Sequence, residues 1–271
     1  SSNTALVASG NVTFAGTGGS RTVTVTPPTD ANGTSTVTIR VTSGGQTADE
    51  AFLVTVTAVD DGPTITAISD PAAISEGGTV GPISFTIADI DSDIALATMS
   101  LYTSSNTVLV PTSGSVTFAG SVGSRTVTVV PSTDANGTST VTIRVTSGGR
   151  TADEAFLVTV TAVDDGPTIS AISDPAAISE GGTVGPISFT IADIDTDIAL
   201  ATMSMLSSSN TALVASGNVT FAGTGGSRTV TVTPPTDANG TSTVTIRVTS
   251  GGQTADEAFT VTVTAVDDGP T

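Results

Sequence analysis

The residues best suited to chemistry are aspartates that occupy every second position in two short runs. These runs are Asp89, Asp91 and Asp93, and, further along the chain, Asp193, Asp195 and Asp197. Alternate positions of an extended chain point to the same side, so each run brings three carboxylates together. Close carboxylates repel one another unless a cation is present. Because Ca²⁺ takes roughly six to eight oxygen ligands, mostly carboxylates and carbonyls, the runs indicate calcium binding.

Acidic side chains in loops also have a simpler interpretation. Aspartate fills turns because its carboxylate accepts hydrogen bonds from nearby backbone N–H groups. For Asp70, which Pro71 follows, we favour this turn interpretation. For Asp153 and Glu154 the turn and calcium interpretations are equally good.

The charge balance of the chain limits its partners. The 271 residues include 25 acidic side chains and seven arginines, but no lysine, histidine or cysteine, and the net charge is −18. Nucleic acids and anionic membrane surfaces are disfavoured because they bind clustered cations, whereas cations are natural partners of such a chain. No apolar run reaches the length of about 18 residues that predicts a membrane-spanning segment.

Catalysis has few candidate groups in this composition. Without His, Cys or Lys the chain offers no imidazole base, thiol or amine. Paired carboxylates could serve a glycosidase, but here they recur in every copy of an internal repeat, so we expect no enzymatic function. The same absences exclude disulfides and Lys–Asn isopeptide cross-links, which leaves bound metal as the route to rigidity.

The internal repeat sets the domain size. Residues 1–64 match residues 208–271 with one difference, Leu53 against Thr260. The repeat length of 103–104 residues is that of a whole domain.

The motif Val-Asp-Asp-Gly-Pro marks a short, stiff linker at residues 59–63, 163–167 and 266–270. The expected domains are therefore a complete repeat at 62–165, a complete repeat plus the start of the next linker at 166–271, and the C-terminal part of an incomplete repeat at 1–61. Half a sandwich exposes a large apolar face. Either the sequence is cut from a longer array, or a neighbouring chain supplies the missing strands by β-augmentation.

Within a repeat, apolar and polar residues alternate, which is the pattern of half-buried antiparallel strands. Val37, Ile39 and Val41, for example, are separated by Thr38 and Arg40. In the middle repeat we expect about seven strands, near residues 64–69, 82–88, 95–102, 107–110 with 115–119, 125–130, 138–146 and 155–163. The fold class predicted is all-β, with tandem Ig-like or cadherin-like Greek-key β-sandwiches of about seven strands each.

Sandwich topology then groups the acidic loops. The loop with Asp89, Asp91 and Asp93 lies at the end where the chain enters a domain, and the loops with Glu76 and Asp134 lie at the exit end. Stacked domains would bring the exit-end residues near the alternating run of the next repeat. The expected cluster at the second junction comprises Glu76, Asp134, Asp164, Asp165, Asp193, Asp195 and Asp197.

Three segments carry a family resemblance: "AVDDGPT", "ISEGGTVGPISFTIADIDTDI" and "TDANGTSTVTIRVTSGG". They resemble the cadherin-like and Ig-like tandem repeats of very large bacterial surface proteins, in which calcium bound at a linker stiffens each junction. The resemblance implies linker ligands at Asp60, Asp61, Asp164 and Asp165, D-x-D ligands at Asp89, Asp91, Asp193 and Asp195, and early-strand ligands at Glu76 and Glu180. Asp replaces Asn and Gly replaces Ala in this linker, which affects the backbone-carbonyl ligand.

These features favour a structural segment of an extracellular fibre or adhesin stalk, from a bacterial cell surface, rigidified by Ca²⁺ at its junctions. Its expected partners are neighbouring repeats or copies of itself, joined by strand exchange or lateral contacts. Two alternatives stay open. The chain could be an array of modules that bind carbohydrate or another cell, although aromatic residues make up only 3% of it. It could also be an accessory region of a larger secreted enzyme.

Overall fold

The computed structural model describes residues 1–267 and residue 269. Besides strands, these residues form only the short 3₁₀ turns η1 (Ser9–Asn11), η2 (Ile94–Leu96), η3 (Ile198–Leu200) and η4 (Ser216–Asn218). Among them no helix is long and apolar enough to cross a membrane. The all-β class predicted from the sequence is confirmed. The third linker motif, at 266–270, lies partly outside the described residues.

The chain divides into two compact units. The first comprises Ser1–Ala72, Thr79–Val130 and Thr138–Val158, and the second comprises Ala73–Gly78, Pro131–Gly137 and Thr159–Thr271. This division crosses the middle repeat. The domain boundaries expected from the linker motif differ from it and stay a prediction.

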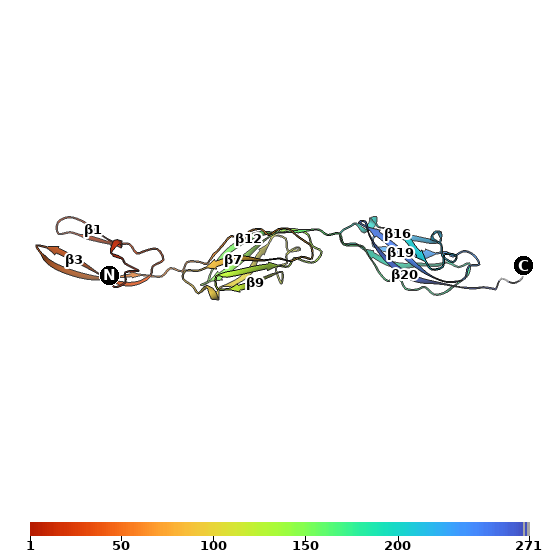
Figure 1. The fold of residues 1–271 in the computed structure, drawn as a ribbon, viewed down its shortest axis with the longest axis horizontal. Coiled ribbons are helices and arrows are strands. Elements are labelled where there is room, and N and C mark those ends of the chain that lie inside the picture. Colours follow the sequence, from red (N-terminus) through yellow and green to blue (C-terminus); the bar gives the residue numbers. More distant parts are fainter. Residues whose placement is uncertain (268, 270–271) are drawn as a thin grey trace. The chain divides into compact units, whose positions relative to one another are not determined.

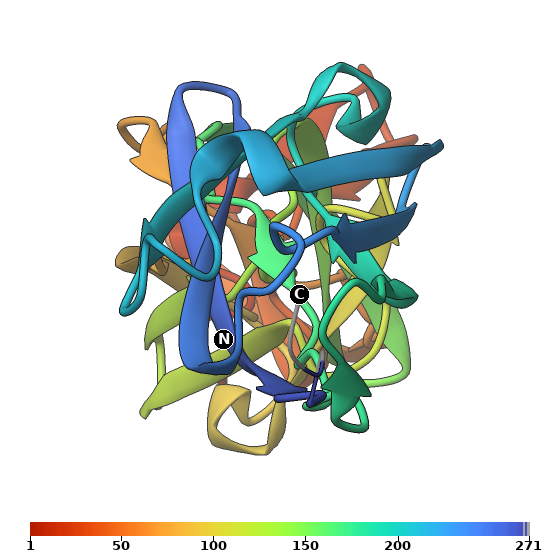
Figure 2. The same ribbon diagram turned by 90° about the vertical axis from the view of Figure 1, so that its right-hand side faces the viewer.

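The third repeat lies entirely in the second unit. Its strands are β13 (Thr168–Ile169), β14 (Ile178–Ser179), β15 (Val184–Ala192), β16 (Thr202–Ser208), β17 (Val219–Thr224), β18 (Ser227–Val232), β19 (Gly240–Ser250) and β20 (Gln253–Thr264). They form sheets of order β13-β15-β18-β17 and β14-β20-β19-β16. The long hairpin of β19 and β20 is drawn in blue in Figures 1 and 2. This strand order is that of an Ig-like Greek-key sandwich.

Alternating side chains fix the register of this sandwich. Val244, Ile246 and Val248 on β19 are fully buried, whereas the residues between them lie nearer the surface. On β20, Phe259 and Val261 belong to the same apolar core. Because one face of each strand is buried and the other is polar, a slip of one residue would expose the whole apolar set.

The middle repeat has the corresponding strands. They are β5 (Thr64–Ile65), β6 (Ile74–Ser75), β7 (Val80–Ala88), β8 (Thr98–Ser104), β9 (Val116–Ser121), β10 (Ser124–Val129), β11 (Gly137–Ser147) and β12 (Arg150–Thr161). One sheet has the order β5-β7-β10-β9. In the first unit β8 pairs with β11, and in the second unit β6 pairs in parallel with the end of β12.

Several details of the expected strands are wrong. The strand expected at 64–69 is only the two-residue β5, and the next segment, β6, lies beyond it and joins the other sheet. The strand expected at 95–102 begins with the 3₁₀ turn η2 and is extended only from Thr98. Residues 107–110 form a turn that buries Leu109 and Val110, so their apolar character reflects core packing without strand pairing.

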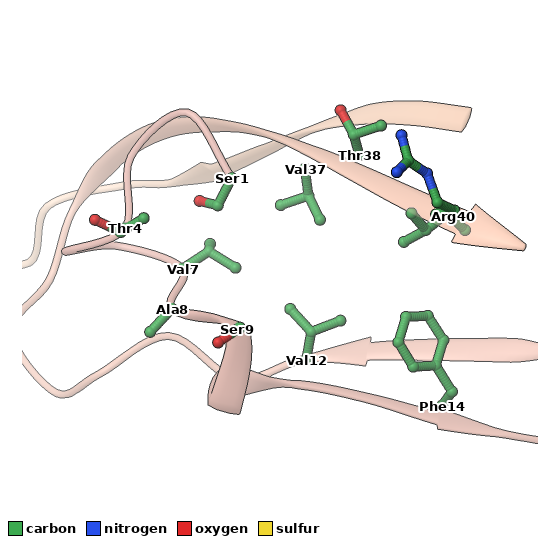
Figure 3. Close-up of a pocket in the computed structure, with 11 residues that line it drawn as sticks. Ser1, Thr4, Val7, Ala8, Ser9, Val12, Phe14, Val37, Thr38 and Arg40 are labelled. Atoms are coloured by element: carbon green, nitrogen blue, oxygen red, sulfur yellow. The ribbon is translucent and has the colours of Figure 1, made fainter. Parts of the chain in front are cut away.

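The first repeat contains β1 (Val12–Ala15), β2 (Thr22–Val25), β3 (Gly33–Ser43) and β4 (Gln46–Val56), paired as β1-β2 and β3-β4. It has no counterparts of β13 to β16, so the face that those strands cover in the third repeat is open. Val41 is 62% exposed, whereas the equivalent Val248 is 0% exposed. The resulting groove has a volume of about 470 Å³. In Figure 3, Val12 faces Val37 across it, and Phe14 lies below Arg40 in the view.

Candidate metal centre

The described residues contain one group of three acidic side chains close enough to share a metal ion. Glu76, Asp165 and Asp195 each offer a carboxylate oxygen, and these atoms lie within 4.8 Å of one another. Ca²⁺ binds oxygens at about 2.3–2.6 Å, so two ligands of one ion lie at most about 5 Å apart. Both the spacing and the all-oxygen donor set fit calcium.

Glu76 is held in place by hydrogen bonds from two other loops. It directly follows β6, whose parallel pairing with β12 brings it to the start of the linker. The backbone N–H of Val163 donates to Oε1 at 2.6 Å, and the Asn136 amide donates to Oε2 at 3.5 Å. The side chain is therefore aligned before any cation arrives.

Asp195 reaches the cluster from the loop after β15. Its Oδ2 accepts a hydrogen bond of 2.7 Å from the backbone N–H of Asp165. This contact ties the alternating run of the third repeat to the linker. The extended geometry expected of this run is wrong, because residues 194–196 form a bend.

Asp193, two residues earlier, presents a buried oxygen to the same region. Its Oδ1 accepts from the backbone N–H groups of Asp195 and Thr196 at 3.0 and 2.9 Å. The nearby Ser250 hydroxyl is the main cause that lowers the pKa of Asp193. Even so, Asp193 Oδ2 and Ser250 Oγ are both buried without a partner in good hydrogen-bond geometry. A buried carboxylate oxygen without a partner is costly, and a cation would satisfy it.

The surroundings of the cluster are strongly negative. The pKa of Asp165 is raised, first by loss of hydration and then by the charges of Asp134, Asp195, Glu76 and Asp164. Asp134, Asp165 and Asp193 line one surface cleft of about 660 Å³. The salt bridges among the described residues include no carboxylate of this group, so its charge is not balanced by any arginine.

The first junction repeats half of this arrangement. The backbone N–H of Asp61 donates to Asp91 Oδ2 at 2.7 Å. Asp89 likewise accepts from two backbone N–H groups and keeps a buried, unpartnered Oδ2. A cavity of about 410 Å³ beside Asp61 is also lined by Asp30, the counterpart of Asp134, and by Asn32 and Val59.

The remaining predicted ligands have other contacts. Asp93 and Asp197 cap the turns η2 and η3 by accepting from the N–H two residues on. Glu180 repeats the bonds of Glu76, with Val266 N–H at 2.7 Å and the Asn239 amide at 3.2 Å. Asp60 pairs with Arg150 at 3.0 Å.

The structure shows the contacts of Asp153 and Glu154, for which the sequence left the turn and calcium interpretations open. Asp153 and Glu154 lie on β12, not in a loop. Asp153 forms a two-pronged salt bridge with Arg144, and Glu154 accepts from the backbone N–H of Ile68. The turn interpretation of Asp70 expected a nearby backbone N–H as its partner, which is wrong. Its carboxylate accepts from the N–H of Leu157, far along the chain.

Sequence reasoning missed the glycine turn that closes the last hairpin of each complete repeat. A Cβ added to Gly251 would lie 2.7 Å from Thr196 Oγ1 and 3.0 Å from Asp164 Oδ1. A Cβ on Gly148 would meet Ser92 Oγ and Asp60 Oδ1 in the same way. The turn signal was visible, but its contact with the aspartate run depends on the tertiary fold.

It also missed two buried arginines that hold the loops after the aspartate runs. Arg125 is 8% exposed and donates to the carbonyls of Gly120 and Ile94, at 2.8 and 3.3 Å. Arg228 donates to the carbonyl of Ile198 at 3.2 Å. A signal existed, because alternation places Arg125 on the same face of its strand as the buried residues at 127 and 129.

Comparison with known proteins gives the following similarities. A sequence profile of a family described as "Lipoprotein associated domain" matches residues 178–266, and no curated protein sequence matches the chain. The protocadherin GammaB4 extracellular domain matches at 14% identity and a TM-score of 0.46, over 93% of this chain and 43% of that one. The titin domains z1z2 in complex with telethonin match at 14% identity and a TM-score of 0.33, over 77% of this chain and 99% of that one.

An endo-fucoidan hydrolase from glycoside hydrolase family 107 matches at 15% identity and a TM-score of 0.32, over 94% of this chain and 37% of that one. The chain therefore spans less than half the length of the protocadherin and hydrolase chains. The complete repeats are cadherin-like, Ig-like β-sandwiches. Their strand order supports this description. In each repeat the first two short strands join different sheets, and the last hairpin forms the centre of the second sheet.

Proposed function

We propose that this chain is a structural segment of an extracellular array of Ig-like repeats, stiffened by calcium at the junctions between repeats. The observation that carries the proposal is the origin of the three clustered carboxylates. Glu76 precedes the linker, Asp165 belongs to it and Asp195 follows it. A cation held by all three would restrain the linker from both sides.

The chain's own groups prepare this restraint. Glu76 accepts from Val163 N–H and Asp195 accepts from Asp165 N–H, so two linker residues are already aligned by hydrogen bonds. A bound Ca²⁺ would supply the positive charge that opposes the repulsion among the carboxylates. With that repulsion removed, the same hydrogen bonds hold the linker more firmly.

Calcium titration of the whole chain tests the proposal. Isothermal titration calorimetry should show saturable binding, and thermal unfolding should occur at a higher temperature in Ca²⁺ than in EDTA. At a hundredfold excess over Kd the native state gains about 2.7 kcal/mol. An unchanged melting temperature in EDTA, together with no binding heat, would contradict the proposal.

A pair of matched variants assigns the binding to this junction. Glu76→Gln keeps one oxygen that can accept from the Val163 N–H but replaces the other with an NH2 donor and removes one charge from the cluster, so the tightest calcium affinity should fall at least about tenfold. Glu180→Gln makes the same change in a side chain with the same two types of bond. Glu180 lies outside the Glu76, Asp165 and Asp195 group, so that variant should keep the affinity of the parent chain.

We assign the array to the extracellular space on chemical grounds. Calcium sites of extracellular modules work at about 10⁻⁴–10⁻³ M, a range that suits exposed carboxylates such as Asp165 and Asp195. The absence of His, Cys and Lys removes the usual catalytic groups, which favours a structural role over an enzymatic one. Secretion of the native protein and its distribution in cell fractions would test this assignment.

The open groove of the first repeat supports a second property, completion by added strands. The groove is lined by Val7, Val12, Phe14, Val37 and Ile39. Residues 1–64 differ from residues 208–271 at one position, so the two repeats present the same surface to strands such as β13 to β16. We therefore propose that the groove accepts a segment with the sequence of residues 166–207.

A whole second copy is a poor donor of this segment. If it donated residues 166–207, its own third repeat would lose the same cover, and the number of open faces would not change. A separate segment has no such cost. Added to the chain, a peptide of residues 166–207 should bind. It should also slow backbone amide hydrogen exchange in the strands that carry Phe14 and Val41. Equal exchange with and without the peptide would rule out the completion.

A further inference from the structure

Arg150 is the one charged residue of the middle repeat that the third repeat does not share. Each of the other acidic residues and arginines of the middle repeat recurs at the equivalent position of the third repeat. At the position of Arg150 the third repeat has Gln253, and the first repeat has Gln46. Near-identical repeats therefore differ in charge at a single place.

That place faces the linker in both complete repeats. Arg150 carbons lie 3.5 and 3.7 Å from a Cβ built on Gly62, and the Cβ of Gln253 lies 3.6 Å from one built on Gly166. The two side chains thus pack on the same glycine of the Val-Asp-Asp-Gly-Pro motif. They begin the same strand, β12 in one repeat and β20 in the other.

Their polar ends make different contacts. Arg150 Nε lies 3.0 Å from a carboxylate oxygen of Asp60. The Gln253 amide instead donates to the backbone carbonyl of Asp164. Consequently the carboxylate of Asp60 has a cation beside it, whereas that of Asp164 forms no salt bridge among the described residues.

We propose that Arg150 acts as a fixed cation at the first junction and thereby sets its calcium affinity below that of the second junction. This inference rests on the proposed function, because it concerns the same type of site. The choice of Arg or Gln at the start of the last strand would then be a specificity-determining feature of each junction. Junctions with Arg would be less dependent on calcium, and junctions with Gln more dependent on it.

The chemistry of the two cations explains the difference. A guanidinium is always protonated and stays attached to the chain, so it offsets part of the carboxylate charge at any calcium concentration. The same charge repels a divalent ion that approaches the neighbouring oxygens. As an ion pair alone, Arg150 with Asp60 contributes little stability because both side chains are about half exposed, at 54% and 40%. Its main effect is therefore on cation binding.

Exchanging the two residues in the whole chain tests the inference. Gln253→Arg places the fixed charge at the second junction, where the tight site is expected, and should lower its calcium affinity roughly tenfold. The gain in melting temperature on adding Ca²⁺ should shrink in this variant. Arg150→Gln should tighten the weaker class of sites and raise the number of ions counted by native mass spectrometry at limiting calcium.

Gln46→Arg is the matched control, since it adds the same charge at the equivalent hairpin position of a repeat remote in sequence from the second junction. It should leave the tight affinity unchanged. The inference is overturned if Gln253→Arg binds calcium as tightly as the parent chain, or if Gln46→Arg weakens binding to the same extent. Failure of the parent chain to bind calcium at all would instead overturn the proposed function, so the two failures are distinguishable.

Discussion

The two linkers of this chain have the same sequence, Val-Asp-Asp-Gly-Pro, but lie in different electrostatic surroundings. At the second, Asp165 meets Asp195 and Glu76 from two other loops, and within the described part of the chain no salt bridge joins them to an arginine. At the first, the Asp61 N–H donates to Asp91, Asp30 lines a cavity together with Asp61, and Arg150 forms a salt bridge with Asp60. Identical linker motifs therefore do not have identical surroundings, because those depend on the loops that converge on each linker.

The two junctions differ in the charge at residue 150 or 253. The hydrogen bonds between the linker and the aspartate run are the same at both junctions, 2.7 Å in each case. Preorganisation is thus shared, and the number of converging charges is what differs.

The largest effect on calcium binding should come from replacing the equivalent aspartates of the two junctions, Asp195 and Asp91, one at a time. Asp195→Asn keeps an acceptor for the linker N–H but removes one of the clustered charges. We expect it to weaken the tightest calcium binding by at least about tenfold, or about 1.4 kcal/mol. Asp91→Asn makes the same change at the first junction and should alter only weak binding. Calorimetry on both variants checks this contrast, and equal losses would show that the junctions are equivalent.

A smaller effect should follow from filling the space at the hairpin turn. In Gly251→Ala the added methyl group would press on Asp164 and Thr196, so calcium affinity should fall several-fold. Gly252→Ala is the control, because its Cβ meets nothing within 4 Å. Both glycines have positive φ, 58° and 88°, so either variant should lose about 1–2 kcal/mol of unfolding free energy through backbone strain.

Calcium affinity, not stability, separates these two glycine variants. Equal affinities would mean that the turn does not position Asp164. The comparison can be extended to Gly148→Ala, whose Cβ would meet Ser92 and Asp60. Since the first junction is expected to bind weakly, that substitution should change stability more than it changes binding.

Sequence patterns predicted the fold well where strands are long and have one buried face. On β11 and β19 the alternation of apolar and polar residues is complete, and the buried set is the one expected. The pattern failed for β5, β6, β13 and β14, which are two residues long and contain no full period. Their positions depend on pairing with β7, β12, β15 and β20, a tertiary property that local sequence does not encode.

For the candidate site, the sequence identified the loops but not their mutual geometry. Asp165 and Asp195 were predicted to meet, and a hydrogen bond joins them. Asp197 was predicted for the same cluster, but its carboxylate bonds to its own turn at Ala199 N–H. Spacing alone does not separate these roles, because Asp195 and Asp197 follow the same alternation. The run bends at residues 194–196 and the 3₁₀ turn η3 begins directly after Asp197, so the extended geometry on which the prediction depended is not present.

The smallest effect we expect concerns the response of the junction to pH, through Asp165. Its pKa is raised in the native state, so the native state binds its proton more tightly than the unfolded chain, whose aspartates titrate near about 3.9. Its contribution to stability is present below that value and is lost as pH rises through the raised pKa. Asp89 and Asp193, whose pKa values are lowered, act in the opposite sense and lose their contribution as pH falls below about 4.

Asp165→Asn isolates the contribution of the Asp165 carboxylate to the pH dependence of stability. In EDTA at pH 7 the variant should be slightly more stable than the parent chain, and the difference should shrink as pH falls toward about 4, because protonation removes the same charge. In saturating Ca²⁺ at pH 7 the order should reverse, since the carboxylate is then a ligand and its loss weakens binding. Urea unfolding in the two conditions measures both signs. An Asp165→Asn effect of the same sign with and without Ca²⁺ would show that this carboxylate does not bind the ion.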